Sequence, residues 1–179
     1  NIYDTLVKYK EESTEVEPCL ATSWETSEDG KTWTFHLREG VKFHDGTPFN
    51  AEAVVISLER QLKEDHPYHF EGSDFAYWGY MYSDVESVSA LDDMTVKITL
   101  KAPNASFLSN MAMFTVMIVS PAALEKYGID IGTHPVGTGA FKFVEWIRDD
   151  RIVLEANEDY WAGRPYLDKL IIKSIPDNT

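Results

Sequence analysis

The sequence predicts an α+β fold in which a mixed or antiparallel β-sheet is flanked by helices. Pairs of alternating apolar and polar segments are joined by short turns that carry Asp-Gly or Asp-Asp, a pattern typical of antiparallel hairpins. Between these pairs lie segments with apolar residues at helical spacing, preceded by capping residues. The length of 179 residues suits one domain or slightly more, since a domain takes roughly 100–200 residues.

The chain is predicted to open with an amphipathic segment and a hairpin. Three apolar residues at the start have helical spacing: Ile2, Leu6 and Val7. A turn at residues 27–31, which contains Asp-Gly, joins residues 20–24 to a strand at 32–37. Because this strand alternates, its apolar residues should share one buried face and His36 should point to solvent.

A capped helix and a long aromatic loop are predicted next. Asn50 is a good N-cap for a helix over residues 51–63, because its side chain can accept a hydrogen bond from a free N–H of the first turn. The helix should bury one apolar stripe: Val54, Val55, Leu58 and Leu62. Residues 65–82 are rich in aromatic side chains and have no clear period, which predicts a loop with at most one short helix. Loops of this length often carry function.

The rest of the chain is predicted to form short strands, two helices and a glycine-rich turn. Strands are expected at residues 85–90, 94–100, 114–119, 141–148, 151–156 and 170–175, with Pro176 ending the last one. A short helix is expected at 107–113. A second helix should begin after the N-cap Ser120 and end at Gly128. Residues 136–140 form the glycine-rich turn.

Composition and charge exclude several kinds of partner. The net charge of −14 argues against nucleic acid and against anionic membrane surfaces, because both would be repelled. The single cysteine, Cys19, allows no intrachain disulfide and no cysteine-rich metal site, and its acidic neighbours should raise the pKa of its thiol. No window approaches the roughly 18 apolar residues that cross a bilayer. Because the chain begins at Asn1 rather than Met, we expect it to be cut from a longer protein whose signal segment is not in this chain.

No group of residues has the pattern typical of an enzyme or a metalloprotein. His66 and His69 are close in sequence, but no third ligand is in register, so no metal site is expected. There is no Gly-x-Ser-x-Gly element and no phosphate-binding Gly-Lys-Ser/Thr element. Residues 137–139 begin like a dinucleotide fingerprint, but Lys142 occupies the place of the third glycine and a strand follows. The sequence therefore predicts neither catalysis nor a cofactor.

Several long motifs together resemble one protein family. Residues 20–49 have the sequence LATSWETSEDGKTWTFHLREGVKFHDGTPF. This run resembles, nearly residue by residue, the signature of bacterial family 5 extracytoplasmic solute-binding proteins, the dipeptide-, oligopeptide- and nickel-binding components of ABC importers. Further segments resemble later elements of the family: NAEAVV at 50–55, DDMTV at 92–96, PVGTGAF at 135–141 and NEDYW at 157–161. Two positions depart from it, since Ala140 replaces the usual proline and Cys19 the usual glycine.

This resemblance implies a two-lobed protein of the periplasmic-binding-protein type II-like fold that closes around its ligand at a hinge. Residues 1–179 would form part of the first lobe, with a helix- and loop-rich subdomain at about 43–134 and a sheet portion at about 1–42 and 135–179. The residues that pair with peptide termini in the family are expected outside this chain.

The same resemblance implies a function in import. The protein would capture oligo- or dipeptides for a bacterial ABC importer and deliver them to its membrane permease. It would be a monomer in the periplasm, or a cell-surface lipoprotein in a Gram-positive organism. Two alternatives stay open: a protein that binds a nickel chelate or other small solute, and an isolated structural or interaction domain without its own solute site.

Three residues are candidates for contact with a ligand. Tyr68 matches a Pro-Tyr element whose tyrosine faces the ligand in peptide-binding relatives, although a loop tyrosine can equally pack on its own lobe. Phe114 and Thr115 match a segment that lines the cleft in relatives, but the apolar run around them favours a place in the core.

Overall fold

A computed structural model describes residues 1–175, which form three antiparallel sheets with helices around them. Strand β1 (Val7–Tyr9) pairs with β2 (Val16–Pro18). The four-stranded sheet contains, in spatial order, β3 (Ala21–Thr26), β4 (Thr32–Leu37), β6 (Thr95–Leu100) and β5 (Val85–Asp92). The three-stranded sheet contains β7 (Phe141–Ile147), β8 (Arg151–Ala156) and β9 (Lys169–Lys173). The helices are α1 (Ala51–Leu62), α2 (Ala76–Met81), α3 (Phe107–Asn110) and α4 (Pro121–Tyr127), with 3-10 turns η1 (Phe114–Val116) and η2 (Gly128–Thr133). The predicted α+β class is confirmed.

The four-stranded sheet is built around the predicted hairpin. Strand β4 lies inside the sheet, where it pairs with β3 on one side and β6 on the other. Its alternation buries Phe35 completely and leaves His36 exposed, as expected for a strand with one buried face. Gly30 closes the β3–β4 turn with a φ of 68°, a left-handed conformation that glycine adopts without strain.

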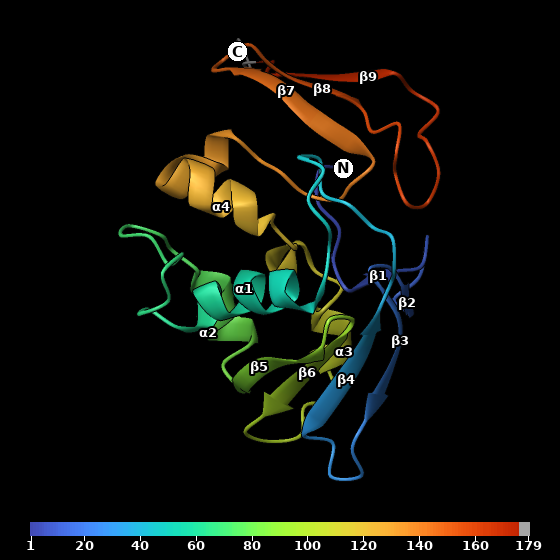
Figure 1. Ribbon diagram of the computed structural model, residues 1–179, viewed down its shortest axis with the longest axis vertical. Helices are drawn as coiled ribbons and strands as arrows, with labels where there is room; N and C mark the ends of the chain where they lie inside the picture. Colours follow the sequence, from blue (N-terminus) through green and yellow to red (C-terminus); the bar gives the residue numbers. More distant parts are fainter. Residues whose placement is uncertain (176–179) are drawn as a thin grey trace.

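Helix α1 connects the layers of the molecule. The Asn50 side chain accepts a hydrogen bond from the Ala53 N–H at 3.0 Å and so caps the helix as predicted. Val54 and Leu58 are fully buried, and α1 packs against β5 and β6. Figure 1 shows α1 and α2 beside the four-stranded sheet, with α4 between α1 and the three-stranded sheet.

The three-stranded sheet is tied to the start of the chain through residues 136–140. The Gly139 N–H donates to the Ile2 carbonyl at 2.9 Å, and the Phe141 N–H donates to the Asn1 carbonyl at 3.0 Å. The predicted glycine-rich turn thus also binds the backbone of the N-terminal residues. Apolar side chains on the outer strands of this sheet stay exposed, among them Val144, Trp146, Ile171 and Ile172.

The predicted helical start and the predicted strand at 114–119 are both wrong. Residues 1–6 are irregular and Val7 begins β1, because the N-terminal backbone bonds to distant segments and not to itself. The strand predicted at 114–119 is replaced by η1 and an extended stretch without a strand partner. There the Val119 N–H donates to the Ser57 hydroxyl at 3.0 Å, so side-chain bonding takes the place of a ladder.

The other predicted elements are present with shifted ends, whereas β1, β2 and η2 were not predicted. The helix expected at 107–113 ends at Asn110, and the last strand covers Lys169–Lys173. Pro176 lies outside the described residues. Among the helices of residues 1–175, none has the length and the apolar character that a membrane span requires.

Candidate functional site

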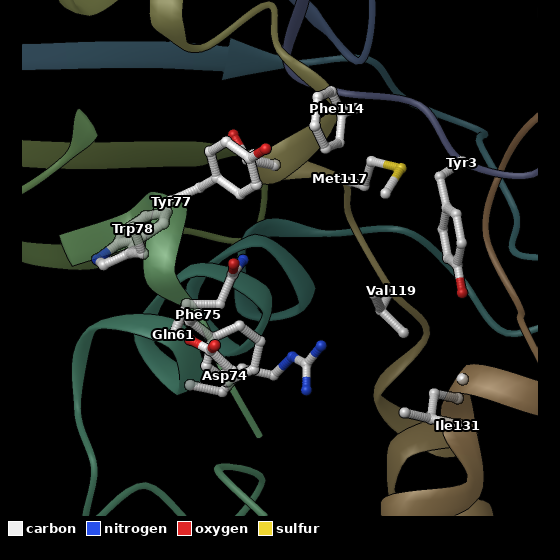
Figure 2. A pocket seen from close by; sticks show the side chains of 13 residues that line it. Tyr3, Gln61, Asp74, Phe75, Tyr77, Trp78, Phe114, Met117, Val119 and Ile131 are labelled. Carbon is white, nitrogen blue, oxygen red and sulfur yellow. The ribbon is translucent and has the colours of Figure 1, made fainter. Parts of the chain in front are cut away.

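The candidate site is a cavity of about 300 Å³ where α1, the segment around α2, residues 114–119 and the N-terminal segment meet. We call it the central cavity. It is lined by Tyr3, Arg60, Gln61, Asp74, Phe75, Tyr77, Trp78, Phe114, Thr115, Met117, Val119, Ile131 and Gly132. Figure 2 shows labelled aromatic and aliphatic side chains from these segments around one open space. An apolar wall with a few polar groups is typical of a small-molecule site.

A second hollow, of about 500 Å³, lies on the α2 side of the same wall and shares four lining residues with the central cavity: Gln61, Asp74, Phe75 and Trp78. Its other lining residues are mostly polar or charged, among them Glu64, Ser83 and Lys101. We take the central cavity as the candidate because it combines the more apolar wall with a partly buried cation.

Ser57 fixes the floor of the central cavity. Its buried hydroxyl donates to the Val119 carbonyl at 3.3 Å and accepts from the Val119 N–H at 3.0 Å. These two bonds hold the extended stretch after η1 against α1. Arg60 and Gln61, one helical turn after Ser57, consequently reach the cavity beside Val119.

Thr115 is held in the wall by a buried tyrosine. The Tyr82 hydroxyl donates to the Asn110 carbonyl at 2.6 Å and lies 2.8 Å from the Thr115 hydroxyl oxygen. Burial raises the pKa of Tyr82, against the lowering effect of the Thr115 hydrogen bond, so the phenol stays protonated. The Trp78 ring stacks on Tyr82 with centroids 4.7 Å apart. The wall therefore has little freedom to move at this point.

Arg60 brings a positive charge to the cavity. Its guanidinium carbon lies 5.1 Å from the centre of the Phe75 ring, and Nη1 donates a long hydrogen bond of 3.4 Å to the Tyr68 carbonyl. The Nε atom is buried and has no hydrogen-bond partner within residues 1–175, and no carboxylate of that stretch lies within 4.0 Å of the group. Burial lowers the pKa of Arg60, but a guanidinium stays charged at neutral pH.

Tyr3 adds a neutral donor to the same space. Burial raises the pKa of its hydroxyl to about 12, although the nearby Arg60 charge acts in the opposite direction. The hydroxyl therefore stays protonated at neutral pH. Figure 2 shows Tyr3 across the open space from Phe75. The cavity thus offers a cation, a phenol and the Gln61 amide beside apolar surface.

Comparison with known proteins assigns the chain to a family. Residues 15–179 match the model described as "Bacterial extracellular solute-binding proteins, family 5 Middle". The chain belongs to this family. Its members are solute-binding components of transport systems and not enzymes, as the sequence predicts.

Two relatives match nearly the whole length of the chain. Heme-binding protein A of Haemophilus influenzae is 43% identical in a match that covers 99% of this chain and 35% of that protein. The dipeptide-binding protein of Escherichia coli K12 is 40% identical in a match that covers 98% of this chain and 36% of that protein. The chain therefore spans about a third of the length of these relatives.

A solved structure confirms the expected fold. The ABC transporter-associated periplasmic binding protein DppA of Helicobacter pylori, in complex with the peptide STSA, superposes with a TM-score of 0.93 at 42% identity. The match covers 99% of the family 5 chain and 37% of that structure. The chain is thus the N-terminal part of a periplasmic-binding-protein type II fold.

Two family 5 motifs serve the scaffold and not the cavity. The Asp4 carboxylate accepts hydrogen bonds from the Thr138 hydroxyl at 3.0 Å and from the Trp161 indole at 2.9 Å. The Tyr160 hydroxyl donates to the same carboxylate at 3.3 Å. The motifs at 135–141 and 157–161 therefore meet at Asp4, and none of these side chains lines the central cavity.

The three predicted site residues differ in their relation to the cavity. Phe114 and Thr115 both line it. Phe114 is 59% exposed and meets the Tyr77 ring edge-on, with centroids 5.7 Å apart, so the apolar run around it does not draw it into the core. Tyr68 does not line the cavity. It is half-buried, and its contact with the site is the bond from Arg60 to its carbonyl.

The sequence prediction missed Tyr3, Arg60 and Phe75. Arg60 lies opposite the apolar stripe of α1, where a charged residue is expected to face solvent, so its place in the cavity left no signal in the sequence. Tyr3 and Phe75 reach the cavity through long-range packing, which no local pattern in the sequence indicates.

The histidines and the cysteine take structural roles. His66 Nδ1 accepts from the Tyr68 N–H at 3.2 Å, and the His69 ring lies 2.8 Å from the Arg60 carbonyl. Within residues 1–175 there is no cluster of three or more His, Cys, Asp or Glu that could hold a metal ion. Burial, with a smaller effect of Asp4, raises the pKa of Cys19 to about 11, so its thiol is a poor nucleophile. Burial is thus the larger cause, rather than the acidic neighbours expected from the sequence.

Proposed function

We propose that the chain is part of the first lobe of a substrate-binding protein that captures short peptides outside the cytoplasm for an ABC importer. The observation that carries the proposal is the central cavity, with its apolar wall and its few polar donors, on a chain of this family. A dipeptide-binding relative and a peptide-bound structural neighbour support a peptide as the ligand. In this proposal the protein delivers the bound peptide to the membrane permease of the importer.

The cavity suits part of a peptide better than a bulky solute. A volume of about 300 Å³ lies at the lower end of the roughly 300–1,000 Å³ that small-molecule pockets occupy. Its polar groups can bond the amides and carbonyls of a peptide, while its apolar wall accepts a side chain. In this proposal residues 43–134 supply most of the ligand face, with Tyr3 added from the N-terminal segment. Residues 1–42 and 135–179 supply supporting strands, and β5 and β6 complete the four-stranded sheet.

Within this site we propose different roles for the three predicted residues. Phe114 and Thr115 contact the ligand directly, because their side chains line the cavity. Tyr68 acts through its backbone, since its carbonyl orients Arg60. A side-chain substitution at Phe114 therefore changes the binding surface. A substitution at Tyr68 leaves in place the carbonyl that bonds Arg60.

Thermal unfolding of the intact protein tests the proposal. A ligand that binds only the native state stabilises it by mass action, by about 2.7 kcal/mol at 100 times its Kd. We expect short peptides to raise the Tm, and Phe114→Ala to weaken peptide binding about tenfold without lowering the Tm of the ligand-free protein. Leu91→Ala, an exposed apolar residue on β5, is the matched control and should change neither quantity.

Two other results would redirect the proposal. A rise in Tm with nickel chelates and none with a diverse peptide panel would favour a metal-chelate binder. No rise with any small solute would favour an interaction domain without its own solute site.

A further inference from the structure

The central cavity contains a cation whose hydrogen-bonding capacity is largely unused. The protein is acidic, with 30 Asp and Glu against 16 Lys and Arg, and two of its other arginines pair with carboxylates. Arg151 forms ion pairs with two carboxylates and so does Arg164. For Arg60, residues 1–175 provide one long hydrogen bond to a carbonyl and no carboxylate within 4.0 Å.

The position of Arg60 is fixed before any ligand arrives. Its guanidinium lies over the Phe75 ring, and its Nη1 is bonded to the Tyr68 carbonyl. A stacked guanidinium keeps its planar edge of N–H donors in one orientation and loses little entropy when it binds. A partly buried cation without a counterion is costly, and an incoming anion would remove that cost.

The surroundings of Arg60 select an anion that is attached to something apolar. The Tyr3 hydroxyl is a second donor in the wall, and the remaining surface includes Met117, Val119 and Ile131. Asp74 also lines the cavity, but it is exposed. This carboxylate would repel a second negative group, so the site suits a single charge of the size of a carboxylate.

We propose that Arg60 and Tyr3 form an anion-binding subsite that takes a carboxylate of the captured peptide. The peptide's adjoining apolar part would lie against Phe114 and Met117. This inference rests on the proposed function and adds a selectivity to it: peptides that place a carboxylate in this subsite bind more tightly than the matching amides. Two parts of a peptide can supply the group, an acidic side chain or the C-terminus.

The test is a set of binding titrations on the intact protein with four peptides. Ala-Glu-Ala and Ala-Gln-Ala differ only in the side-chain carboxylate, and each is used with a free and with an amidated C-terminus. Arg60→Gln removes the cation. Because a hydrogen bond between charged groups contributes on the order of 1.5–3 kcal/mol, we expect Arg60→Gln to abolish a preference of about 10- to 100-fold for one of the two carboxylates.

Two further variants keep the test interpretable. Lys63→Gln is the matched control: it removes a positive charge at the end of the same helix, where Lys63 pairs with Glu59 at 2.6 Å outside the cavity. It should leave every preference unchanged. Tyr3→Phe keeps the ring and removes only the hydroxyl, so it tests the subsite even where Arg60→Gln lowers the amount of folded protein. It should reduce the same preference about fivefold, as expected for one hydrogen bond.

The outcomes separate the subsite from the function. If Arg60→Gln abolishes the preference for the glutamate or for the free C-terminus, that preference identifies the source of the carboxylate and supports the subsite. An equal loss of affinity for all four peptides in Arg60→Gln overturns the subsite and leaves peptide capture intact. No binding of any peptide to the unsubstituted protein overturns peptide capture, and the subsite with it.

Discussion

Gly139 shows at the scale of one residue how a motif without ligand contacts can be indispensable. A Cβ at this position would lie 2.3 Å from the Asn1 carbonyl oxygen and 2.6 Å from the Ile2 carbonyl carbon. Both atoms belong to the backbone, so neither can rotate away. The close approach lets the Gly139 N–H donate to the Ile2 carbonyl. This bond fixes the N-terminal segment, in which Tyr3 follows Ile2 and lines the central cavity.

We expect Gly139→Ala to lower the free energy of unfolding of the intact protein by about 2–3 kcal/mol, because the new methyl group forces the N-terminal segment to move. Urea unfolding measures this loss. Gly79→Ala is the control, since a Cβ added to Gly79 in α2 would have nothing within 4 Å and alanine favours a helix. A Gly139→Ala protein as stable as the parent would show that the N-terminal segment is not held at this turn.

Residues whose environment is local could be predicted from the sequence, and residues whose environment is distant could not. Asn50 caps α1 and Gly30 closes a hairpin, as expected, because the partners of both lie within three residues. The apolar neighbours of Phe114 favour a place in the core, yet this residue is 59% exposed. Its exposure depends on how η1 packs against the aromatic segment around Tyr77, which is 37 positions away in the sequence. For the same reason, the sequence did not predict that Tyr3 and Phe75 line the cavity.

At the scale of elements, the stretch from η1 to α4 decides the shape of the cavity. Its apolar composition resembles that of a buried strand, which explains the strand prediction. A strand needs a neighbouring strand for its backbone, and here Ser57 and Asp4 bond to that backbone instead: the Ile118 N–H donates to the Asp4 carbonyl at 3.1 Å. The stretch is therefore extended but unpaired, and its side chains face the cavity on the side that Met117 and Val119 line.

Ser120 ends this stretch and begins α4. Its hydroxyl accepts from the Ala123 N–H at 3.1 Å and donates to the Asp45 carboxylate at 2.5 Å. Although burial alone would raise the pKa of Asp45, hydrogen bonds from Ser120 and Thr47 lower it, so the acceptor is a charged carboxylate at neutral pH. A single buried hydroxyl thus joins α4 to the turn before α1.

We expect Ser120→Ala to lower the free energy of unfolding by about 1–2 kcal/mol, because it removes the helix cap and one charge-assisted hydrogen bond. Chemical unfolding of the intact protein gives the value. Ser106→Ala provides the comparison: Ser106 precedes α3 at the same helical position but makes no side-chain capping bond, so its loss should stay within about 0.5 kcal/mol. Equal effects of the two substitutions would contradict the role assigned to Ser120.

At the scale of the whole chain, the fold brings α1, α2, η1, η2 and the N-terminal segment together around one cavity. The four-stranded sheet and α1 form one layer, and the three-stranded sheet lies at the other end of the chain's long axis (Figure 1). Most of the elements after residue 20 and the family were predictable, because hairpin turns, caps and long motifs each consist of contiguous residues. The position of the cavity was not, since its walls come from segments between Tyr3 and Gly132 that meet only in the folded chain.

The chain of 179 residues spans about a third of the length of its relatives, and this sets an upper limit on what it can bind alone. Association costs on the order of 4–15 kcal/mol in lost freedom before any contact is counted. A cavity of about 300 Å³ that is open to solvent offers a short peptide contacts on one side. We therefore expect the isolated chain to bind peptides no tighter than about millimolar, which corresponds to about −4 kcal/mol.

Calorimetric titration of the isolated chain and of the intact protein with the same peptide measures this difference. Circular dichroism must first show that the isolated chain is folded, and sedimentation that it is monomeric, because exposed Trp146, Ile171 and Ile172 offer a surface for self-association. A micromolar affinity of the folded, monomeric chain would refute the expectation. It would mean that the central cavity alone carries most of the binding energy, and that lobe closure serves to retain the ligand more than to recognise it.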